Sequence, residues 1–265
     1  GECPVWSTDE QVLYWVDIDA PALNRFDPAS GRNTAMPMPE AIGCFALRAG
    51  FWFAAADGRL ERKVADAPYD PAHHRFNDGR CDPQGRFLAG TMNERRDANS
   101  AALVRLDPDL TVTRILDDMM VSNGLAFSPD GRTMYHADTP THVVRAYDYD
   151  AATGLPSRPR VLARWSGETE RPDGAAVDVE GCYWIAFYRG GRVLRIAPSG
   201  ETLQDLRVPA LCPTMCALGG PERKTLYVTS ARKGRDPDEL ARFPHSGGIF
   251  ALPVAVPALP SLPFA

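Results

Sequence analysis

The sequence predicts an all-β fold, a six-bladed β-propeller formed by a single domain over residues 1–265. Two observations lead to this prediction. The 24 Pro and 22 Gly stand in many short clusters, which favours turns and disfavours long helices. A hairpin motif also recurs at intervals of roughly 35 to 50 residues, which is the period of propeller blades. We expect the proline-rich segment at about 253–265 to form a tail outside the blades.

The composition is typical of a globular protein in water, with 44% hydrophobic and 24% charged residues. The net charge of -5 provides no basic surface for nucleic acid and argues against acidic membranes. No apolar run approaches the length of a membrane helix, and residues 1–10 lack the basic and apolar regions of a signal peptide. We therefore expect a cytoplasmic protein, monomeric or weakly self-associating, although the missing initial Met leaves a removed leader open.

The six cysteines show no C-x-x-C spacing, so the sequence supports neither a zinc knuckle nor a thioredoxin-like motif. Cys212 and Cys216 are close enough in sequence to meet. In a chain of this length we nevertheless expect reduced cysteines that fill the core.

The strands can be followed in order from the N-terminus. Residues 11–18, QVLYWVDI, with ALNRF and the turn DPASG after them, predict two strands and a turn. Residues 42–63 predict a strand, a turn near Gly50, an aromatic strand, a turn at Asp57-Gly58 and a polar outer strand.

The hairpin then repeats four times, each copy with an outer strand of its own. The copies are 75–93 with AALVRLDPD, 122–139 with HVVRAYDYDAATG, 172–188 with GRVLRIAPSG, and 213–231 with SGGIFALPV. Short strands with Asp-Gly turns also build β-sandwiches. The recurrent outer strand and turn, seen in RFDPASG, VRLDPD and LRIAPSG, favours equivalent blades.

One position recurs eight residues before the turn of each copy, and we call it the slot. The slot residues are Glu2, Ile42, Asn77, Asn123, Asp173 and, where the turn is irregular, a residue near Met215. A glycine follows within two residues in four copies, where we expect backbones to crowd: Gly43, Gly79, Gly124 and Gly174. Because the inner strand of every blade lines the central channel, slots far apart in the sequence should converge on the axis.

The converging slots predict a metal site on the central axis. Glu2 and Asp173 supply carboxylates and Asn123 supplies an amide oxygen, to which Asn77 could add a second, with no His or Cys among them. Hard oxygen donors suit Ca, Mg or Mn and accept Zn or Fe(II) less selectively. So few protein ligands leave positions for water or substrate, which favours a catalytic ion. A single Asn or Asp before Gly would instead be a turn residue, but three copies sharing the slot favour the site.

Arg75 lies two residues before Asn77, so both should point toward the channel. Arg75 could bind substrate hydroxyls or a product carboxylate, or form a surface salt bridge. The histidines show no ligand spacing, and no G-x-S-x-G motif supports a Ser-His-Asp triad.

Five segments together resemble the senescence-marker-protein/gluconolactonase/regucalcin family: GECPVW, RFNDGRCDPQGRFLAGTM, SNGLAFSPDG, PDGAAVDVEGCYWIA and PTMCALGGPERKTLYVTSA. The resemblance spans residues 1 to about 250. It implies a six-bladed propeller that binds one divalent cation on its axis and hydrolyses sugar lactones. It places the metal ligands on Glu2, Asn123 and Asp173, and the substrate contacts on Arg75 and Asn77.

Two departures from the family pattern leave the substrate open among glucono-, arabinono-, xylono- and other lactones. Cys3 stands where the family usually has Gly, which could alter the backbone at Glu2. The residues after GTM, where related proteins place acidic substrate contacts, are Asn93, Glu94, Arg95 and Arg96.

Our mechanistic hypothesis is that the cation polarises the lactone carbonyl while Asp173 accepts the proton of the attacking water and returns it to the ring oxygen. A metal-bound hydroxide is the alternative nucleophile. Three other functions stay open: a calcium-binding regulatory protein of the regucalcin type, an aryl-ester or organophosphate hydrolase with a catalytic His, and a metal-free interaction propeller. Buried acidic slots without a cation argue against the last.

Overall fold

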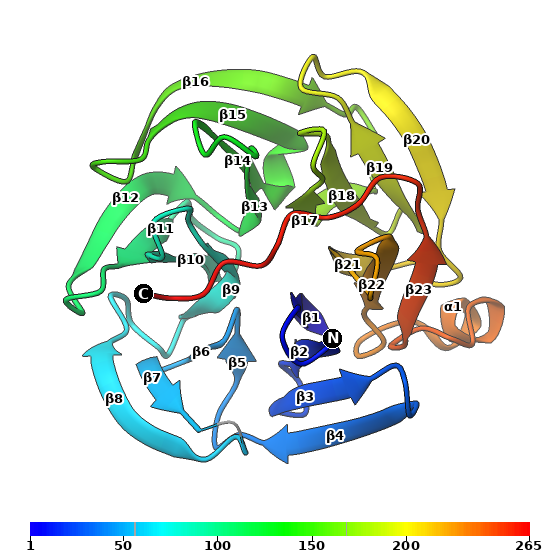
Figure 1. Cartoon of the computed structure of the whole chain (residues 1–265), viewed down its shortest axis with the longest axis horizontal. Helices are drawn as coiled ribbons and strands as arrows, with labels where there is room; N and C mark the ends of the chain where they lie inside the picture. Colours follow the sequence, from blue (N-terminus) through cyan, green and yellow to red (C-terminus); the bar gives the residue numbers. More distant parts are fainter. Residues whose placement is uncertain (56, 168) are drawn as a thin grey trace.

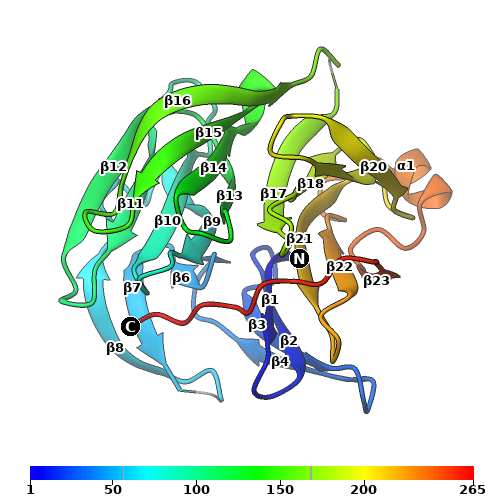
Figure 2. The same cartoon turned by 45° about the horizontal axis from the view of Figure 1, so that its top comes forward.

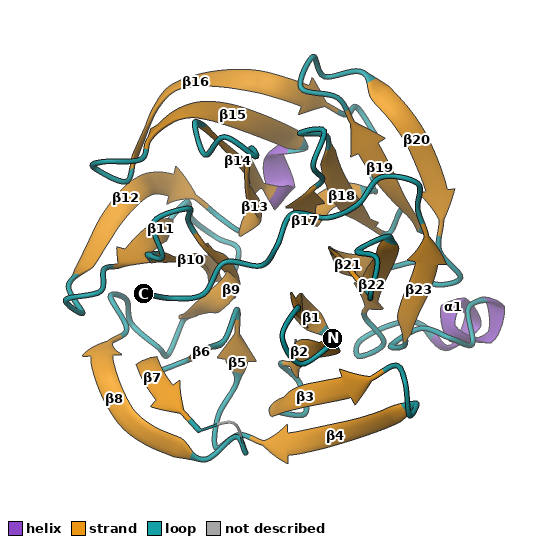
Figure 3. Cartoon of the chain, viewed as in Figure 1, coloured by secondary structure: helices purple, strands orange, loops and turns teal. Residues whose placement is uncertain are grey.

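Six β-sheets surround a central axis in the computed structural model, which describes residues 1–55, 57–167 and 169–265 (Figure 1). Nearly all of the regular structure is strand, with one short α-helix and one 3-10 turn in the described chain (Figure 3). The all-β six-bladed propeller expected from the repeats is therefore confirmed. No helix in the described part of the chain is long and apolar enough to cross a membrane.

Each blade is an antiparallel sheet whose strands follow the chain from the axis outward. The first three blades are β1 (Glu2–Ser7), β2 (Val12–Asp17), β3 (Ala22–Asp27), β4 (Arg32–Pro37); β5 (Ile42–Gly43), β6 (Ala46–Leu47), β7 (Gly50–Ala54), β8 (Leu60–Asp66); and β9 (His74–Cys81), β10 (Phe87–Asn93), β11 (Ala101–Leu106), β12 (Val112–Met119).

The other three blades are β13 (Ser122–Phe127), β14 (Thr133–Asp138), β15 (Val143–Asp150), β16 (Leu155–Arg164); β17 (Arg171–Val177), β18 (Tyr183–Tyr188), β19 (Arg192–Ile196), β20 (Thr202–Arg207); and β21 (Pro213–Gly219), β22 (Thr225–Ser230), β23 (Ile249–Pro253). The 3-10 turn η1 (Thr139–Thr141) follows β14, and helix α1 (Pro237–Arg242) lies between β22 and β23.

The second blade differs from the sequence prediction. The strand expected from Ile42 is divided into β5 and β6, because Cys44 and Phe45 take left-handed conformations with φ of 42° and 62°. Gly43, just before this turn, packs closely against the next blade: a Cβ there would lie 2.3 Å from the carbonyl oxygen of Phe76. The expected backbone crowding at this glycine is thus confirmed.

The ring closes by packing between the first and last blades, because β1 belongs to the first sheet alone. Trp6 of β1 stacks on Tyr227 of β22, with ring centroids 5.7 Å apart. The Thr214 hydroxyl donates a 2.7 Å hydrogen bond to the carbonyl oxygen of Gly1. These contacts fix the start of β1 beside the channel.

Buried aspartates in the turns of two inner hairpins bind neighbouring side chains. Asp178 is fully buried and accepts hydrogen bonds from Trp184 Nε1 at 2.9 Å and Arg195 Nε at 2.8 Å. Asp82 makes an equivalent set with Arg86 Nε at 2.6 Å and the Tyr149 hydroxyl at 2.7 Å. Asp178 thus connects the turn of the fifth blade to β18 and β19, and Asp82 connects the third blade to Tyr149 of the fourth.

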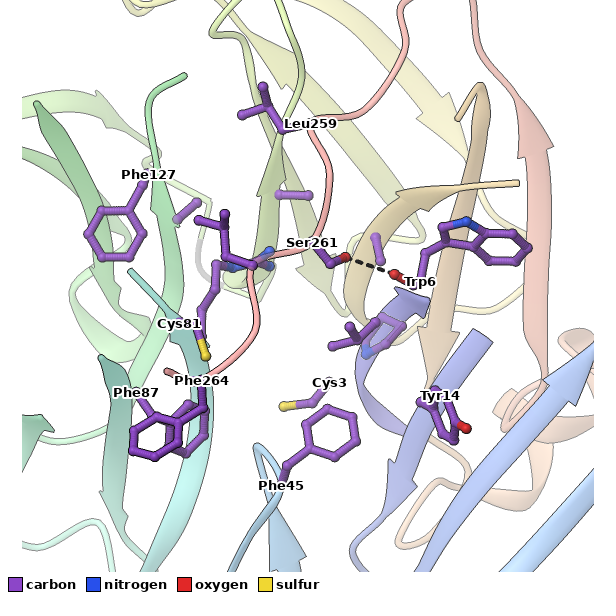
Figure 4. A pocket seen from close by; sticks show the side chains of 18 of the residues that line it. Cys3, Trp6, Tyr14, Phe45, Cys81, Phe87, Phe127, Leu259, Ser261 and Phe264 are labelled. Atoms are coloured by element: carbon purple, nitrogen blue, oxygen red, sulfur yellow. Dashed lines mark hydrogen bonds between the residues drawn. The ribbon is translucent and has the colours of Figure 1, made fainter. Parts of the chain in front are cut away.

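The chain after β23 crosses one end of the channel (Figures 1 and 2). Hydrogen bonds fix this segment, 254–265, to three blades: from Ala258 N to Arg223 O at 2.8 Å, from Ser261 Oγ to Trp6 O at 2.8 Å and from Ala265 N to Gly85 O at 2.9 Å. Beneath it lies an apolar cavity of about 620 Å³, where Phe264 and Leu259 face side chains of the blades (Figure 4).

Candidate active site

The predicted slot residues lie on the innermost strands of the six blades. The oxygen-bearing ones line one cavity of about 1080 Å³ together with Arg75: Glu2, Asn77, Asn123 and Asp173. In the second blade the slot residue Ile42 is a buried apolar side chain. In the last blade, where the sequence placed the slot near Met215, the neighbouring Thr214 lines the cavity, whereas Met215 lines the apolar cavity at the other end of the channel. The polar slots therefore converge as the sequence register predicted, and the slot of the second blade contributes no polar group.

A β-bulge explains how the slot side chains reach the axis. The pairing of the innermost strand shifts at the slot in β1 between Glu2 and Val5, in β13 between Asn123 and Ala126, and in β17 after Pro172. A bulge adds one unpaired residue and turns a side chain away from the regular pleat. The repeated bulge thus gives these blades the same local geometry.

Cys3 occupies the bulge of β1 with φ of 47°, a left-handed conformation that favours glycine. Its side chain is buried, and its thiol donates a long 3.6 Å hydrogen bond to the carbonyl oxygen of Asn77. The backbone at Glu2 therefore keeps a conformation suited to glycine although a larger residue is present. All six cysteines are unpaired, as the sequence predicted.

Glu2 and Asp173 are two carboxyl groups of like charge in a site that is largely shielded from water. Burial raises the pKa of Glu2 to about 7, with Arg75 partly offsetting the effect. Burial also raises the pKa of Asp173 well above its usual value, and the neighbouring Glu2 and Asp78 carboxylates add to this. In the described chain, neither slot carboxylate receives a hydrogen bond from another side chain. Each is thus available to a positively charged group in the cavity.

The two slot amides are fixed by a chain of hydrogen bonds. Asn77 Nδ2 donates to Asn123 Oδ1 at 2.9 Å, and Asn123 Nδ2 donates to the Thr139 hydroxyl at 2.7 Å. The Thr139 hydroxyl in turn donates to the carbonyl oxygen of Pro172 at 3.0 Å. This chain sets the orientation of the Asn123 amide, whose oxygen keeps a second lone pair.

Arg75 lines the cavity and does not form a simple surface salt bridge. Its guanidinium donates to Asn77 Oδ1 at 3.0 Å and lies 3.7 Å from Glu94 Oε1, while its side chain is only 17% exposed. Glu94 also binds Arg48 through both carboxylate oxygens, at 2.6 and 2.9 Å. Arg75 is therefore held against the cavity wall beside the slot.

Three other acidic or nucleophilic side chains do not line the cavity. Asp78 is buried behind the slot, where burial raises its pKa and Leu125 N donates to its Oδ2 at 2.8 Å. Ser122 and His136 form a 2.7 Å hydrogen bond, yet both are buried and neither lines the cavity. The structure thus provides no solvent-accessible Ser-His pair at this site.

Sequence reasoning missed several side chains that line the same cavity. They are Arg48, Thr139, Arg171, Tyr188, Arg189, Arg232 and Arg235. Arg171 stands two residues before its slot residue, as Arg75 does, and this repeated spacing could have identified it. The other residues lie in parts of the blades where the copies share no such spacing. Of the four residues that depart from the family pattern after GTM, Glu94 and Arg96 line the cavity.

The donor chemistry of the slot fits a divalent cation. Two carboxylates that repel each other and an oriented amide oxygen form a hard, oxygen-only set. Among the described residues, no group of three or more His, Cys, Asp or Glu side chains is placed to hold a metal. The slot contains only two such side chains, Glu2 and Asp173, so its third protein donor would be an amide.

Comparisons with known proteins agree with the fold and the motifs. A sequence model described as the SMP-30/Gluconolactonase/LRE-like region matches residues 1–232. A 6-deoxy-6-sulfogluconolactonase from Pseudomonas putida is 48% identical over 97% of this chain and 92% of its own length. Regucalcin from Xenopus laevis is 38% identical over 95% of this chain and 90% of its own length.

Among solved structures, the calcium-binding protein regucalcin from Agrobacterium tumefaciens superposes with a TM-score of 0.93 at 29% identity. The match covers 100% of this chain and 93% of that one. The similarity therefore extends over all six blades.

Proposed function

Because this chain belongs to the SMP-30/gluconolactonase/LRE-like family, we propose that it hydrolyses sugar lactones to aldonic acids with the help of one divalent cation. The chain is a lactonase of the gluconolactonase type, and the proposal adds its substrate and its cation. The observation that carries the proposal is the convergence of the slot residues Glu2, Asn123 and Asp173 with Arg75 and Asn77 in one cavity.

Glu2, Asn123 and Asp173 would hold the cation through their side-chain oxygens. When bound, such an ion supplies Lewis-acid polarisation of the lactone carbonyl. Ca, Mg and Mn suit these donors, and Zn and Fe(II) are the less selective alternatives. Glu2 and Asn123 have no further role in this proposal.

The protein's own residues would orient the lactone and move one proton. Arg75 and Asn77 would bind the hydroxyl groups of the sugar on one wall of the cavity. Asp173 would accept a proton from the attacking water and transfer it to the ring oxygen as the bond from the carbonyl carbon to that oxygen breaks. The products are a carboxylic acid and a free hydroxyl group, so all atoms are accounted for.

A calcium-binding regulatory role is the second candidate, and it is favoured by the names of the regucalcin relatives. It predicts calcium binding at micromolar concentration without turnover of any aldonolactone. An aryl-ester or organophosphate hydrolase would be expected to have a His at the channel mouth. No histidine belongs to the described lining of the cavity. A cytoplasmic location and a monomeric or weakly associated state stay predictions from the sequence.

The test is a panel of lactones assayed after chelation and after re-addition of single divalent ions. The panel contains glucono-, arabinono- and xylonolactone and the 6-deoxy-6-sulfo lactone in the name of the Pseudomonas relative. We expect hydrolysis that disappears on chelation and returns with at least one ion. Equal rates with and without metal would contradict the proposed role of the cation.

A further inference from the structure

The cavity that contains the slot is strongly cationic, although the whole protein has a net charge of -5. Its described lining includes eight Arg or Lys side chains and five Asp or Glu side chains, a surplus of three positive charges. Two of the five acids are the slot carboxylates, Glu2 and Asp173. A bound divalent cation would offset their charges and raise the surplus further. An excess of this size attracts anions to the mouth of the channel.

Four of the basic side chains have acidic partners. Arg48 and Arg75 share Glu94, Lys233 lies 2.9 Å from Asp19, and Arg235 lies 3.4 Å from Glu239. The other four form no salt bridge within the described part of the chain: Arg96, Arg171, Arg189 and Arg232. Their positive charges are therefore available to a ligand.

Of these four arginines, Arg171 is the best placed to bind a ligand in the cavity. It opens β17 two residues before the slot residue Asp173, and both line the cavity. Its Nε is buried and has no hydrogen-bond partner among the described residues. A buried donor without a partner costs free energy, unless a ligand supplies the acceptor.

Two further arginines lie at the same side of the mouth. Arg189 follows Tyr188, which pairs directly with Arg171 across β17 and β18. Arg232 follows β22 in the last blade, where its guanidinium donates, among the described residues, to the carbonyl oxygens of Pro244 and Ser246 alone, at 3.4 and 3.3 Å. The fifth and sixth blades thus form a cationic wall. Arg75 and Asn77, by contrast, belong to the third blade.

We propose that Arg171, assisted by Arg189 and Arg232, binds a tetrahedral oxyanion that the lactone carries on its exocyclic carbon. This inference rests on the proposed lactonase function and identifies the substrate class as a sugar lactone with a sulfonate or phosphate group. Three acceptor oxygens on one such group match several guanidinium forks, which bind oxyanions through paired hydrogen bonds. The reacting carbonyl lies at the slot, so the cationic wall receives the far end of the substrate.

The experiment compares three lactones with the same ring: gluconolactone, its 6-deoxy-6-sulfonate and its 6-phosphate. We expect wild-type kcat/KM to be at least tenfold higher for one or both anionic lactones. Arg171→Gln should lower the ratio of anionic to neutral kcat/KM by about 10- to 100-fold, the range for a lost charged hydrogen bond. Arg171→Lys should restore part of the ratio, and Arg158→Gln, a change at an exposed arginine outside the cavity, should leave it unchanged.

The anionic lactone with the higher kcat/KM shows whether the site prefers a sulfonate or a phosphate. An unchanged ratio in Arg171→Gln, or no preference in the wild type, would overturn the proposal. If no lactone is hydrolysed, the proposed function fails. A measurement of sugar binding then tests the anion site separately. Calorimetry should then show that glucose 6-phosphate binds more tightly than glucose to the wild type but not to Arg171→Gln. Equal binding of the two sugars to the wild type would refute the anion site.

Discussion

At the scale of single residues, the amide of Asn123 depends on Thr139, to which the proposal assigns no contact with the cation or the substrate. The Thr139 hydroxyl accepts from Asn123 Nδ2 and donates to Pro172 O, so it determines which way the amide oxygen points. Residues that orient metal ligands commonly change metal affinity by about 10- to 100-fold when they are removed.

We predict that Thr139→Val weakens divalent-cation binding by about tenfold, because the Asn123 amide loses the partner that orients it. Thr141→Val in the same 3-10 turn is the control, since the Thr141 hydroxyl donates to Asp138 O and to no slot residue in the described chain. The measurement is calorimetric titration of both variants with calcium and manganese. An affinity for Thr139→Val equal to that of the control would show that the orientation of the amide does not matter.

His136 gives a second prediction at this scale, concerning stability and pH. Burial lowers the pKa of His136 to about 4, whereas a histidine in the unfolded chain titrates near 6.5. Between these values the unfolded chain binds more protons, so the stability contributed by neutral His136 is present above pH 6.5 and is lost as the pH falls toward 4.

Relative to His136→Gln, the wild type should therefore lose up to about 3 kcal/mol of unfolding free energy between pH 7 and pH 4. The glutamine stays neutral and can keep a hydrogen bond to Ser122. Urea unfolding of both proteins across this pH range tests the difference. A difference that does not vary with pH would mean that His136 titrates normally in the folded protein.

The sequence identified the slot residues because they repeat, and it missed the residues that do not. Asn77, Asn123 and Asp173 share a spacing from their turns, and the structure brings them into one cavity. Asp78 lies off that spacing and is indeed buried away from the cavity. Thr139 does not share such a spacing, and the arrangement of the blades reveals its role. Arg171 stands two residues before its slot residue, as Arg75 does, so the repeat contained a signal for it that the sequence reasoning did not use.

At the scale of elements, β-bulges shape the innermost strands of several blades, and buried Asp turns stabilise the third and fifth blades. Strand alternation and turn residues predicted the hairpins, but not the bulges that turn the slot side chains inward. A bulge depends on the pairing of two strands, which a single segment does not specify. The short helix α1 had local signals that the sequence reasoning did not use: Asp236 caps its N-terminus by accepting a hydrogen bond from Asp238 N, and Pro237 follows it.

The buried turn aspartate Asp178 should contribute much more to stability than an exposed one. We predict that Asp178→Ala lowers the unfolding free energy by about 3 to 5 kcal/mol, because it leaves Arg195 and Trp184 buried without their acceptor. Asp130→Ala removes an exposed aspartate from an equivalent turn and should cost at most about 1 kcal/mol. Chemical denaturation measures both, and equal losses would contradict this role of Asp178.

At the scale of the whole molecule, the channel has two different ends. The slot and the cationic wall line one cavity, while segment 254–265 covers an apolar cavity at the other end (Figures 2 and 4). Among the described residues, the two cavities share no lining side chain. Stability and substrate binding should therefore respond separately to changes at each end.

Deletion of residues 256–265 tests this separation. The deletion exposes apolar surface around Phe264 and Leu259, so we expect unfolding free energy to fall by roughly 1 to 3 kcal/mol. The KM for a lactone substrate should stay within about twofold of the wild type, because no residue of the deleted segment lines the described slot cavity. A tenfold rise in KM at unchanged stability would instead place the segment in the site.

The central claim is that slot residues from separate blades form one metal-dependent lactonase centre, and one measurement tests it most directly. The opening of a lactone to its acid is followed by ¹³C NMR of the carbonyl carbon, for wild type, Asp173→Asn and the exposed control Asp9→Asn, each chelated and then given a divalent ion. We predict that the ion restores turnover to the wild type and Asp9→Asn, while Asp173→Asn stays at least about 100-fold slower. Full metal-dependent turnover by Asp173→Asn would contradict the claim.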